Sequence, residues 1–594
     1  MQLHEFYESR INACKDSFAI LKKKENRLSA GRLILFLFSF FLFYIFFSTS
    51  VALSVILLTV GLFSLGWLIR YQNGVIAEKE YYQHLTTINE LELKSLEGDY
   101  SSYPDGSEYV NKSHPYTHDL DIFGKASLFQ YINRTISKPA SDMLAGWLKS
   151  PASPEEIVRR QEAVAELKDM ADWRQKLMAL GYQYKDAANH PKAVLSWINS
   201  PEGFLGRKFL QIALVLLTLV TLTIAVLVIK GLPVAILVVM LGVNMIVNYK
   251  YLKMVNTLHQ QVSKSYDMLQ SYGDAIRLIE SQSFRSRKMT LLLENLKGKG
   301  SASGIIKRLS SLVNKFDLRL NVMVSLPLNI FFFWDIHFCF ALERWKKRNA
   351  GSISTWFASM AEVEVLSGIA NMSFNNPGWT MPKVIEDYFR LEARNMGHPL
   401  IPHGRRVNND FTIDGSGKIV LVTGSNMSGK STFQRTCGVN MILAFAGAPV
   451  CADHFEVSRV NILTSMRISD SLEDNTSSFY AELKRLAMII HESEVNRNVF
   501  LLLDEILRGT NSNDRHIGSE ALIRQLIQQD TTAIVATHDL SLSELENELP
   551  ARIDNYNFDV KIMGEELFFD YKLNHGICKS LNASILMKKM GIKV

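Results

Sequence analysis

The chain has 594 residues, too many for one hydrophobic core, and this length predicts three or four domains. Its formal net charge of +6 is a mild basic excess that is compatible with nucleic acid or an anionic membrane surface but diagnostic of neither. The five cysteines are scattered without a C-x-x-C pair, so the pattern favours neither a disulfide framework nor a zinc site and fits a reducing, cytosolic setting.

The N-terminal part of the chain combines a polar and an apolar segment. Residues 1–31 predict a cytoplasmic helix, whereas residues 32–70 are almost entirely apolar and aromatic. One helix over Leu33–Ile69 would be about 55 Å long, far more than a bilayer core. Two short transmembrane spans joined near Ser48–Ser50 are therefore predicted. We do not expect a cleaved signal peptide, because a largely polar segment precedes the apolar one.

The next three segments are two polar segments followed by a second apolar one. Residues 71–118 contain a charged helical run and then a linker rich in Ser, Gly, Asp, Tyr and Pro. Residues 119–207 have apolar residues three and four apart, which predicts helices. Residues 208–248 predict a second transmembrane hairpin with its turn at Lys230–Pro233. The alternative for both apolar blocks is a set of buried helices in a soluble protein.

Basic residues flank both predicted hairpins at the ends away from their turns, whereas the tight turns carry only Lys230. By the positive-inside rule, the termini and both large polar segments face the cytoplasm. The chain is thus predicted to be a multi-pass protein of the cytoplasmic (inner) membrane. The flanking residues are Arg32, Arg70, Arg207, Lys208, Lys250 and Lys253.

Residues 249–395 predict long helices. They include a third apolar stretch, Val322–Leu342, which contains Pro327, Asp335 and His337. Because a charged residue within a membrane span is costly, we expect this stretch to be a buried soluble helix. Many Lys and Arg residues on the neighbouring helices favour a solvated face, with a nucleic-acid surface as the alternative.

From residue 396 to residue 594 strands and helices alternate, as in a nucleotide-binding α/β domain. The segment IVLVTGSNMSGKST reads as a buried strand, a glycine-rich loop and a helix, and it matches G-x-x-x-x-G-K-[ST]. Gly424 and Gly429 allow the loop N–H groups to turn toward phosphate oxygens. Lys430 would reach the β- and γ-phosphates, and the Ser431 hydroxyl would bind Mg²⁺. A chance match to the bare pattern is the alternative.

A second apolar strand, Val499–Glu505, ends in two carboxylates. In a parallel sheet this end faces the ligand crevice, so Asp504 would reach Mg²⁺ and Glu505 would polarise the attacking water. A third strand, Thr532–Thr537, ends in His538, which would sense the γ-phosphate. The alternatives are a solvated acidic turn and an ordinary loop histidine. Together these motifs predict an ATPase.

The segment SDSLEDNTSSFYAEL lies between the phosphate loop and the acidic strand. Its Ser477 and Ser478 open a predicted helix and could supply hydroxyls and N–H groups to a phosphate on an opposing subunit. A simple helix cap is the alternative.

These motifs together resemble the MutS family of DNA mismatch-repair ATPases. The resemblance is carried by GHPLIP, NND, TGSNMSGKST, GAPVCA, SSFYAEL, LLDEILRGTN and ATHDLSLSEL, in that order, and by a closing YKLNHGICKSLNASILMKKMGI. Upstream, LDIFGKASLFQYINRT and MLAGWLKSPASPEEIVRRQEAVAEL look like the start of the family's helical core. The resemblance covers roughly residues 119–207 and 300–594.

The resemblance implies an α-helical core followed by a C-terminal α/β P-loop (ABC-type) ATPase domain, which here accompanies two transmembrane hairpins. It implies ATP and Mg²⁺ as cofactors, a homodimer formed through the ATPase domains, and opening and closing on DNA. The residues that it assigns to nucleotide, metal or catalysis are Gly424, Asn426, Gly429, Lys430, Ser431, Thr432, Ser477, Ser478, Asp504, Glu505 and His538.

The chain also departs from the family pattern. The mismatch-reading N-terminal domain with its Phe-x-Glu wedge has no counterpart here. Leu507 stands where glycine is usual and Ser425 where proline is usual. Arg406 lies near the position of an aromatic residue that stacks on adenine, and an arginine can also stack on a ring.

Three functions compete on these observations. The first is a membrane-anchored, MutS-like ATPase that couples hydrolysis to mismatched or branched DNA in repair or recombination. The second is an ATP-driven membrane scaffold or remodelling machine without a DNA role. The third, an ABC-type transporter, is disfavoured because no LSGGQ-like signature appears and the predicted spans carry no intramembrane charges.

Overall fold

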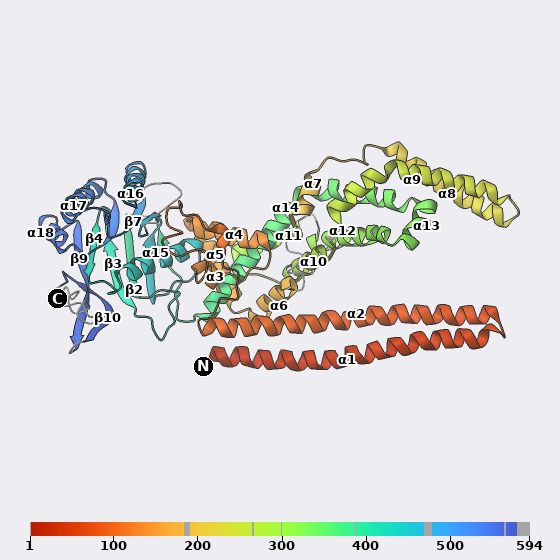
Figure 1. Ribbon diagram of the computed structural model, residues 1–594, viewed down its shortest axis with the longest axis horizontal. Helices are drawn as coiled ribbons and strands as arrows, with labels where there is room; N and C mark the ends of the chain where they lie inside the picture. The colour runs from red at the N-terminus through yellow and green to blue at the C-terminus, as the bar shows by residue number, and fades with distance from the viewer. Residues whose placement is uncertain are drawn as a thin grey trace.

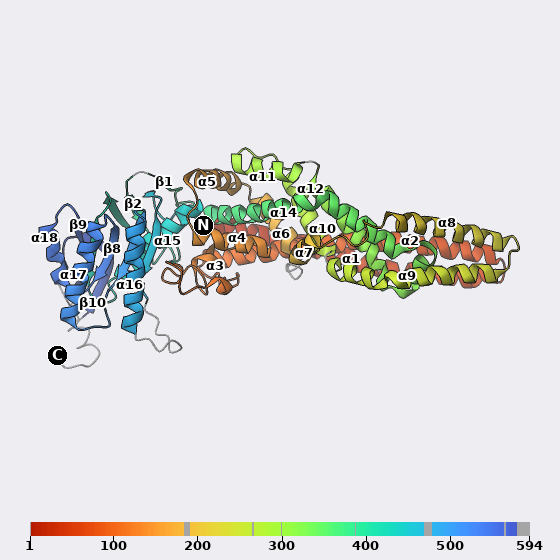
Figure 2. The same ribbon diagram turned by 90° about the horizontal axis from the view of Figure 1, so that it is seen from above.

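The computed structural model describes residues 2–182, 191–263, 266–298, 300–386, 388–467, 478–563 and 566–578. The molecule is elongated. An α/β domain lies at one end, a helical body lies in the middle, and two long helical hairpins extend toward the opposite end (Figures 1 and 2). The predicted order of helical and α/β parts is confirmed.

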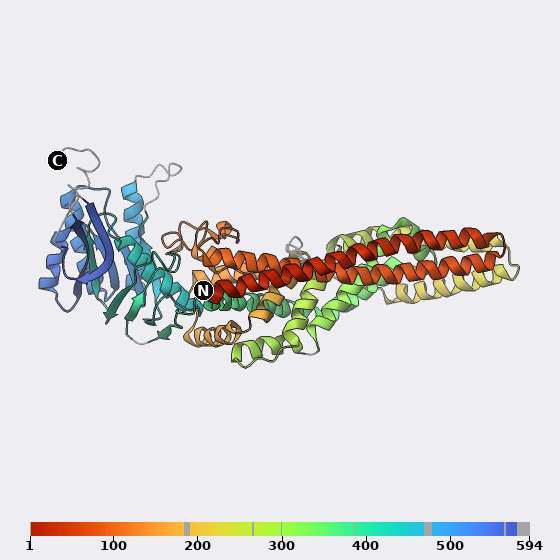
Figure 3. The ribbon, with the colours of Figure 1, turned by 90° about the horizontal axis from the view of Figure 1, so that it is seen from below.

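The first hairpin consists of α1 (Gln2–Phe47) and α2 (Val51–Leu96), joined at the predicted turn, where the Ser50 hydroxyl caps α2. The polar lead-in and the first apolar stretch form one continuous helix. The polar halves of the two helices are joined by an ion pair between Lys79 and Glu25 at 2.7 Å. The apolar halves, near the turn, are exposed, and Phe63 is 82% accessible. Figure 3 shows this hairpin along one side of the helical body.

The second hairpin consists of α8 (Lys208–Ile229) and α9 (Val234–Val262). Its turn also lies at the end of the molecule far from the α/β domain (Figure 1). Among the described residues, α1, α2, the Phe209–Ile229 part of α8, and α9 are long and apolar enough to cross a membrane. In each of these helices, the protein buries almost none of the most apolar segment.

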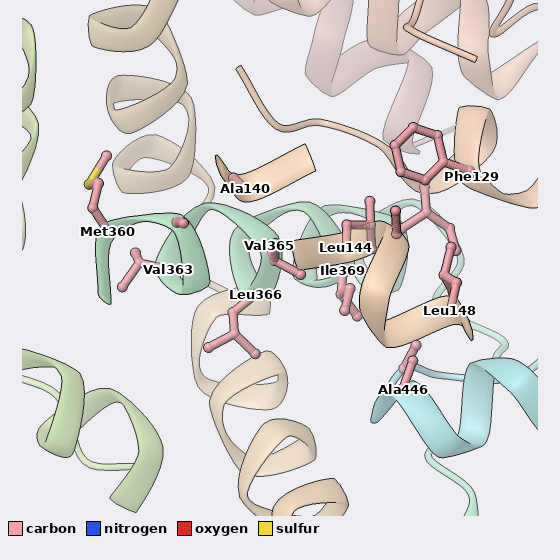
Figure 4. Packing of buried hydrophobic residues seen from close by; sticks show 14 of the residues in the cluster. Phe129, Ala140, Leu144, Leu148, Met360, Val363, Val365, Leu366, Ile369 and Ala446 are labelled. Carbon is pink, nitrogen blue, oxygen red and sulfur yellow. The ribbon is translucent and has the colours of Figure 1, made fainter. Parts of the chain in front are cut away.

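The helical body is organised around α14 (Trp334–Asn375), which packs on α4 and α5. Ser137 and Ser153 cap α4 and α5, each of which has proline in its first turn. Figure 4 shows buried Leu144 of α4 beside Ile369 of α14, with Leu148 nearer to Phe129 and Ala446. Besides α14, the helices of the body in chain order are α3 (Leu128–Ile132), α4 (Lys138–Lys149), α5 (Pro154–Lys168), α6 (Ala171–Tyr182), α7 (Pro191–Asn199), α10 (Tyr266–Glu280), α11 (Arg287–Lys297) and α12 (Ala302–Phe316). Two 3-10 turns lie at Ser107–Tyr109 and Asp317–Leu320.

The third apolar stretch differs from the prediction of one buried helix. It is divided between α13 (Val322–Phe332) and the start of α14, which meet at an angle of 82°. No residue of α13 is buried, so the prediction was wrong for this half, whereas the first turns of α14 are buried as expected. The break occurs at Phe333, which adopts a left-handed conformation with φ of 50°. Sequence pattern cannot distinguish a helix covered by protein from one of equal apolarity that is not covered.

The α/β domain contains two sheets. The larger has strand order β10-β9-β4-β8-β7-β6, in which β9, β4, β8, β7 and β6 are parallel and β10 is antiparallel. The smaller has the order β1-β5-β2-β3. The strands are β1 (Lys383–Ile385), β2 (Arg390–Met396), β3 (Asn409–Asp414), β4 (Ile419–Gly424), β5 (His454–Ser458), β6 (Asn461–Ser465), β7 (Val499–Asp504), β8 (Thr532–Thr537), β9 (Ile553–Met563) and β10 (Glu566–His575).

Helices α15 (Lys430–Ala446), α16 (Ser478–Val495), α17 (Ser512–Gln528) and α18 (Leu545–Glu548), with a 3-10 turn at Leu540–Glu544, complete this domain. The three central strands β4, β7 and β8 are buried along their whole length. Because they are parallel, their carboxyl ends meet at one edge of the sheet, where ligands bind in open α/β folds.

The α/β domain is joined to the helical body by ion pairs at the residue 115–121 linker. Asp121 pairs with Arg435 of α15 at 2.9 Å and with Arg467, beyond β6, at 2.6 Å. Asp119 accepts hydrogen bonds from the Thr464 hydroxyl at 2.6 Å and from the Met466 N–H at 3.1 Å. A displacement of the phosphate-loop helix or of β6 would therefore act directly on this linker.

Candidate nucleotide-binding site

The glycine-rich loop adopts the predicted strand–loop–helix arrangement. Strand β4 ends at Gly424, whose φ is 152°, and α15 begins after Gly429, whose φ is 110°. A Cβ on Gly424 would lie 2.9 Å from the backbone oxygen of Phe558, so only glycine fits there. The loop between these glycines includes Asn426 and the exposed, left-handed Met427.

Lys430 is buried at the start of α15. Its ammonium group donates to the carbonyl oxygens of Gly424 at 2.9 Å and Ser425 at 3.1 Å, and lies 3.4 Å from His538 Nε2. Burial lowers the pKa of Lys430, although the nearby carboxylates of Glu505 and Asp504 oppose this shift. The amine is therefore held inside the loop, at the point where the motif places phosphate oxygens.

Asp504 ends β7 and is 8% exposed. Burial raises its pKa, and a hydrogen bond from Ser431 opposes that shift. Its Oδ1 atom has no hydrogen-bond partner among the described residues. An unpaired carboxylate oxygen beside a hydroxyl fits Mg²⁺, a hard cation that prefers oxygen ligands. No group of three or more His, Cys, Asp or Glu side chains in the described ranges could hold a metal ion.

Glu505 adopts a left-handed conformation with φ of 48°, and its N–H donates to Ala536 on the adjacent β8. One carboxylate oxygen lies 2.8 Å from His538 Nε2, and the other lies 2.9 Å from Arg508 Nε. The hydrogen bond with His538 holds the pKa of Glu505 below its ordinary value, although burial opposes this, and the charge of Arg508 adds to the lowering. Glu505 is therefore a carboxylate at neutral pH. The sequence interpretation did not single out Arg508.

The structure thus brings together the phosphate loop, Asp504, Glu505 and His538 at one edge of the sheet. Of the two serines expected to act in trans, Ser477 lies outside the described residues and Ser478 is the first residue of α16. The next turn of α16 contacts the segment after the acidic strand, because Glu482 accepts a hydrogen bond from the Leu507 N–H. The start of α16 is thus linked to the strand end that carries Glu505.

Leu507, noted as a departure from the family pattern, has φ of 60°. A left-handed residue at this position explains why glycine is suited to it. The Leu507 side chain is buried, and a Cβ on Gly518 of α17 would lie 2.5 Å from its Cδ1 atom. The leucine therefore fills space between the acidic strand end and α17.

A cavity of about 390 Å³ lies beside the loop. Its lining includes the predicted Asn426, Gly429, Lys430, Ser431, Thr432 and Glu505. It also includes Tyr571 of β10, which sequence reasoning missed. A register shift between Phe569 and Leu573 leaves Tyr571 with φ of 51°, and its ring lies 3.2 Å from the position of a Cβ on Gly429. Only the pairing of β10 with β9 brings this residue to the loop, so no local signal marks it.

Arg406 does not line this cavity, contrary to the expectation that it stands near the adenine position. It contacts Cys451, its guanidinium lies 5.9 Å from the ring centre of Trp379, and it lines a separate cavity of about 460 Å³. The neighbouring Arg405 faces the nucleotide cavity instead. The reason is that successive residues of an irregular loop point in different directions, which a motif alignment does not specify.

Comparison with known proteins agrees with this site. Residues 420–590 match the family model of MutS domain V. The DNA mismatch repair protein MutS of Fusobacterium nucleatum is 35% identical over 217 residues, which are 35% of this chain and 24% of that protein. The MutS proteins of Thermotoga sp. (strain RQ2), at 33% over 223 residues, and of Methanosarcina mazei, at 33% over 222 residues, cover 37% and 36% of this chain.

The matched region spans about a quarter of the length of these relatives, at 24%, 27% and 24% respectively. The match to the family model lies within the α/β domain, where β4, α15, β7 and β8 build the candidate nucleotide site. The chain carries a MutS domain V, which is an ATPase domain, behind a largely helical N-terminal region whose described residues include four long apolar helices.

Proposed function

We propose that this chain is a membrane-anchored ATPase of the MutS type, which hydrolyses ATP at sites completed between two copies and couples hydrolysis to DNA. The observation that carries the enzymatic part is the convergence of Lys430, Asp504, Glu505 and His538 at the carboxyl ends of three buried parallel strands. Within this group Lys430 and Glu505 each lie within 3.4 Å of His538.

Each residue has a role that follows from its position. The loop N–H groups and Lys430 bind the phosphates, with Lys430 exchanging its loop carbonyl contacts for phosphate oxygens. Ser431 and Asp504 would hold Mg²⁺, which would neutralise charge on the transferred phosphoryl group. Glu505 orients the attacking water and accepts its proton, and His538 lies between that carboxylate and Lys430, where it contacts the γ-phosphate.

Completion of the site in trans rests on Ser477 and Ser478 at the start of α16. We expect protein with both serines changed to alanine, mixed with Lys430→Ala protein, to regain part of the ATPase activity, because mixed dimers contain one intact composite site. Each variant alone should be inactive. The absence of rescue at every mixing ratio, with dimers confirmed by light scattering, would argue against a site completed across two copies.

The proposal of membrane anchoring rests on four long apolar helices among the described residues and on their basic flanks. By the positive-inside rule, these flanks support a cytoplasmic ATPase domain at the inner membrane. Both hairpins extend to the same end of the molecule (Figure 1), so one bilayer can accommodate them together. Alkaline carbonate extraction of membranes tests this. Anchored protein stays in the pellet, and release into the supernatant would contradict the anchoring.

A role with DNA is suggested by the name of the relatives, DNA mismatch repair protein MutS, and by the basic excess of the chain. The test is the ATPase rate of detergent-purified protein with homoduplex, mismatched and branched DNA. We expect at least one DNA to stimulate hydrolysis and its binding to weaken steeply with salt, since phosphate contacts release counterions. Identical rates with and without every DNA would refute the coupling.

One observation favours the second candidate, an ATP-driven membrane machine without a DNA role. Helix α14 runs from the α/β domain to the base of the second apolar hairpin (Figures 1 and 2). A motion of the ATPase domain would thus reach the apolar end of the molecule through one continuous helix. ATPase activity that responds to bilayer composition but not to DNA would select this candidate.

A further inference from the structure

Helix α13 carries an apolar surface that the protein leaves uncovered. Its sequence, VMVSLPLNIFF, contains no charged residue, and none of its eleven residues is buried. Met323 is 90% exposed and Val322 71% exposed. A continuous apolar helix of this kind is unfavourable in water and requires a covering partner.

The last turn of α13 is bound to the second hairpin through asparagine side chains. Asn244 of α9 donates to the Thr221 hydroxyl of α8 at 2.9 Å and to the Ile330 carbonyl of α13 at 2.9 Å. Asn248 of α9 donates to the Asn329 carbonyl at 2.9 Å. The Asn329 carbonyl also accepts the Phe333 N–H at 3.1 Å. In a lipid environment the carbonyl groups of the last helical turn must be satisfied by protein groups, and the two asparagines add such partners.

The positions of these asparagines define a depth, given the proposed anchoring of the hairpin. Asn244 and Asn248 follow the outer start of α9, at Val234, by about 15 and 21 Å of helix. A hydrocarbon layer of about 30 Å beginning at that turn places both in its middle or cytoplasmic half. An ion pair between Arg319 and Asp335, at 3.0 Å, flanks α13. Arg319 also donates a hydrogen bond to Asn256 of α9. Asn256 follows Val234 by about 33 Å of helix and therefore lies past the hydrocarbon layer.

We propose that α13 is embedded in the cytoplasmic leaflet of the bilayer, as a fifth membrane element beside the second hairpin. The inference rests on the proposed membrane anchoring and adds its partner, the acyl chains of one leaflet. Eleven residues extend about 16 Å, too short to cross, so α13 enters one leaflet only. Its apolar surface is continuous with that of the hairpin, which commits it to lipid rather than to a protein partner.

A groove beside α13 supports lipid as the occupant. The groove has a volume of about 480 Å³ and lies between α8, α13 and the start of α14. Six of its eight lining residues are apolar or aromatic, and Thr218 and His337 are the two polar ones. The six are Val215 and Leu219 of α8, Leu328 and Phe332 of α13, and Trp334 and Phe338 of α14. At the depth given by Asn244 and Asn248, this groove faces acyl chains.

The embedded helix is attached to the motor without a flexible linker. Only Phe333, which is fully buried, separates α13 from α14, and the Asp335 N–H donates to the Asn329 side chain across the bend at 3.0 Å. Helix α14 then extends 42 residues to Asn375, beside the α/β domain. A displacement of α14 during the ATP cycle therefore moves α13 within the leaflet.

The test uses an environment-sensitive NBD fluorophore on Met323→Cys in the full chain, reconstituted into vesicles of phosphatidylcholine and phosphatidylglycerol. All five native cysteines are buried, so the introduced thiol is labelled selectively. Val238→Cys on α9 reports on the anchoring itself, and Leu291→Cys, exposed on α11, is the aqueous control. Doxyl quenchers are placed at acyl carbon 5 or carbon 12, and retained ATPase activity shows that each variant is folded.

We expect the probe at 323 to be quenched at least twofold by the acyl-chain labels, as at 238, with less than 20% quenching at 291. Quenching at 238 combined with a response at 323 equal to that at 291 would overturn the inference while leaving the anchoring intact. No quenching at 238 would refute the anchoring and the inference together. In a Glu505→Gln background, saturating Mg-ATP should change the carbon 5 to carbon 12 quenching ratio at 323, and an unchanged ratio would overturn the coupling to α14.

Discussion

Replacing Glu505 by glutamine separates the catalytic role of this residue from its structural contacts. Glutamine has nearly the same shape, and its one carbonyl oxygen can still accept a hydrogen bond from Arg508 or from His538, but it cannot take a proton from water. The left-handed backbone at this position, with φ of 48°, is the same for either side chain. The variant should therefore fold and bind ATP while losing hydrolysis.

The expected loss of stability is small and the expected loss of catalytic rate is large, so the two roles of Glu505 can be told apart. The carboxylate pairs with His538 and Arg508, whose side chains are 30% and 42% exposed, and pairs of such exposure contribute about 0.2–1 kcal/mol each. Loss of both would cost at most about 2 kcal/mol of stability. A general base contributes about 10²–10⁴-fold to the rate. That factor corresponds to about 3–5 kcal/mol of activation free energy.

The assay compares steady-state ATP turnover, equilibrium binding of a fluorescent ATP analogue, and thermal melting in lipid nanodiscs. Glu544→Gln, an exposed change of the same chemistry in the same domain, is the matched control. We expect turnover of Glu505→Gln to fall at least 100-fold, with analogue binding within about threefold of the unmodified protein. Turnover within threefold, or a loss of binding parallel to the loss of turnover, would refute the assignment of Glu505 as the base.

Three further predictions concern the nucleotide cavity. Tyr571→Ala should weaken ATP binding about 5- to 150-fold through lost stacking worth about 1–3 kcal/mol, with Tyr571→Phe unaffected. Equal affinities of the two variants in titration would exclude an aromatic contact. Gly424→Ala should abolish ATP binding, because its Cβ would meet the Phe558 carbonyl at 2.9 Å, whereas Gly404→Ala, with open space around it, should bind normally. Burial lowers the pKa of His398 to about 4, so the unfolded chain binds this proton first as pH falls. Protonation of His398 in the unfolded chain therefore lowers the free energy of unfolding by up to about 3 kcal/mol as the pH falls from 6.5 to about 4, with no effect above pH 6.5. His398→Asn should make the melting temperature depend less on pH over that window. An unchanged pH profile in the variant would refute it.

Sequence reasoning located most of the site because its signals are local. The loop from Gly424 to Ser431 and the acidic end of β7 are each contiguous, and the parallel order of the central strands follows from alternating strands and helices. Sequence reasoning did not identify Arg508, Tyr571 and Arg405, because their places at the site depend on contacts across the fold. Arg508 reaches Glu505 through a turn containing two left-handed residues, and Tyr571 reaches the loop through a strand pairing with an irregular register.

The sequence by itself determined which segment matches a phosphate-binding loop, which segments carry carboxylates, and which are too apolar for water, since each property is set by residues adjacent in the chain. The tertiary structure alone decided how those segments face one another. It divided Val322–Leu342 into an uncovered helix and a buried one, turned Arg406 away from the nucleotide cavity, and held Glu505 between His538 and Arg508. The physical reason is that burial and pairing are properties of surfaces brought together by folding, whereas apolarity and charge belong to each residue alone.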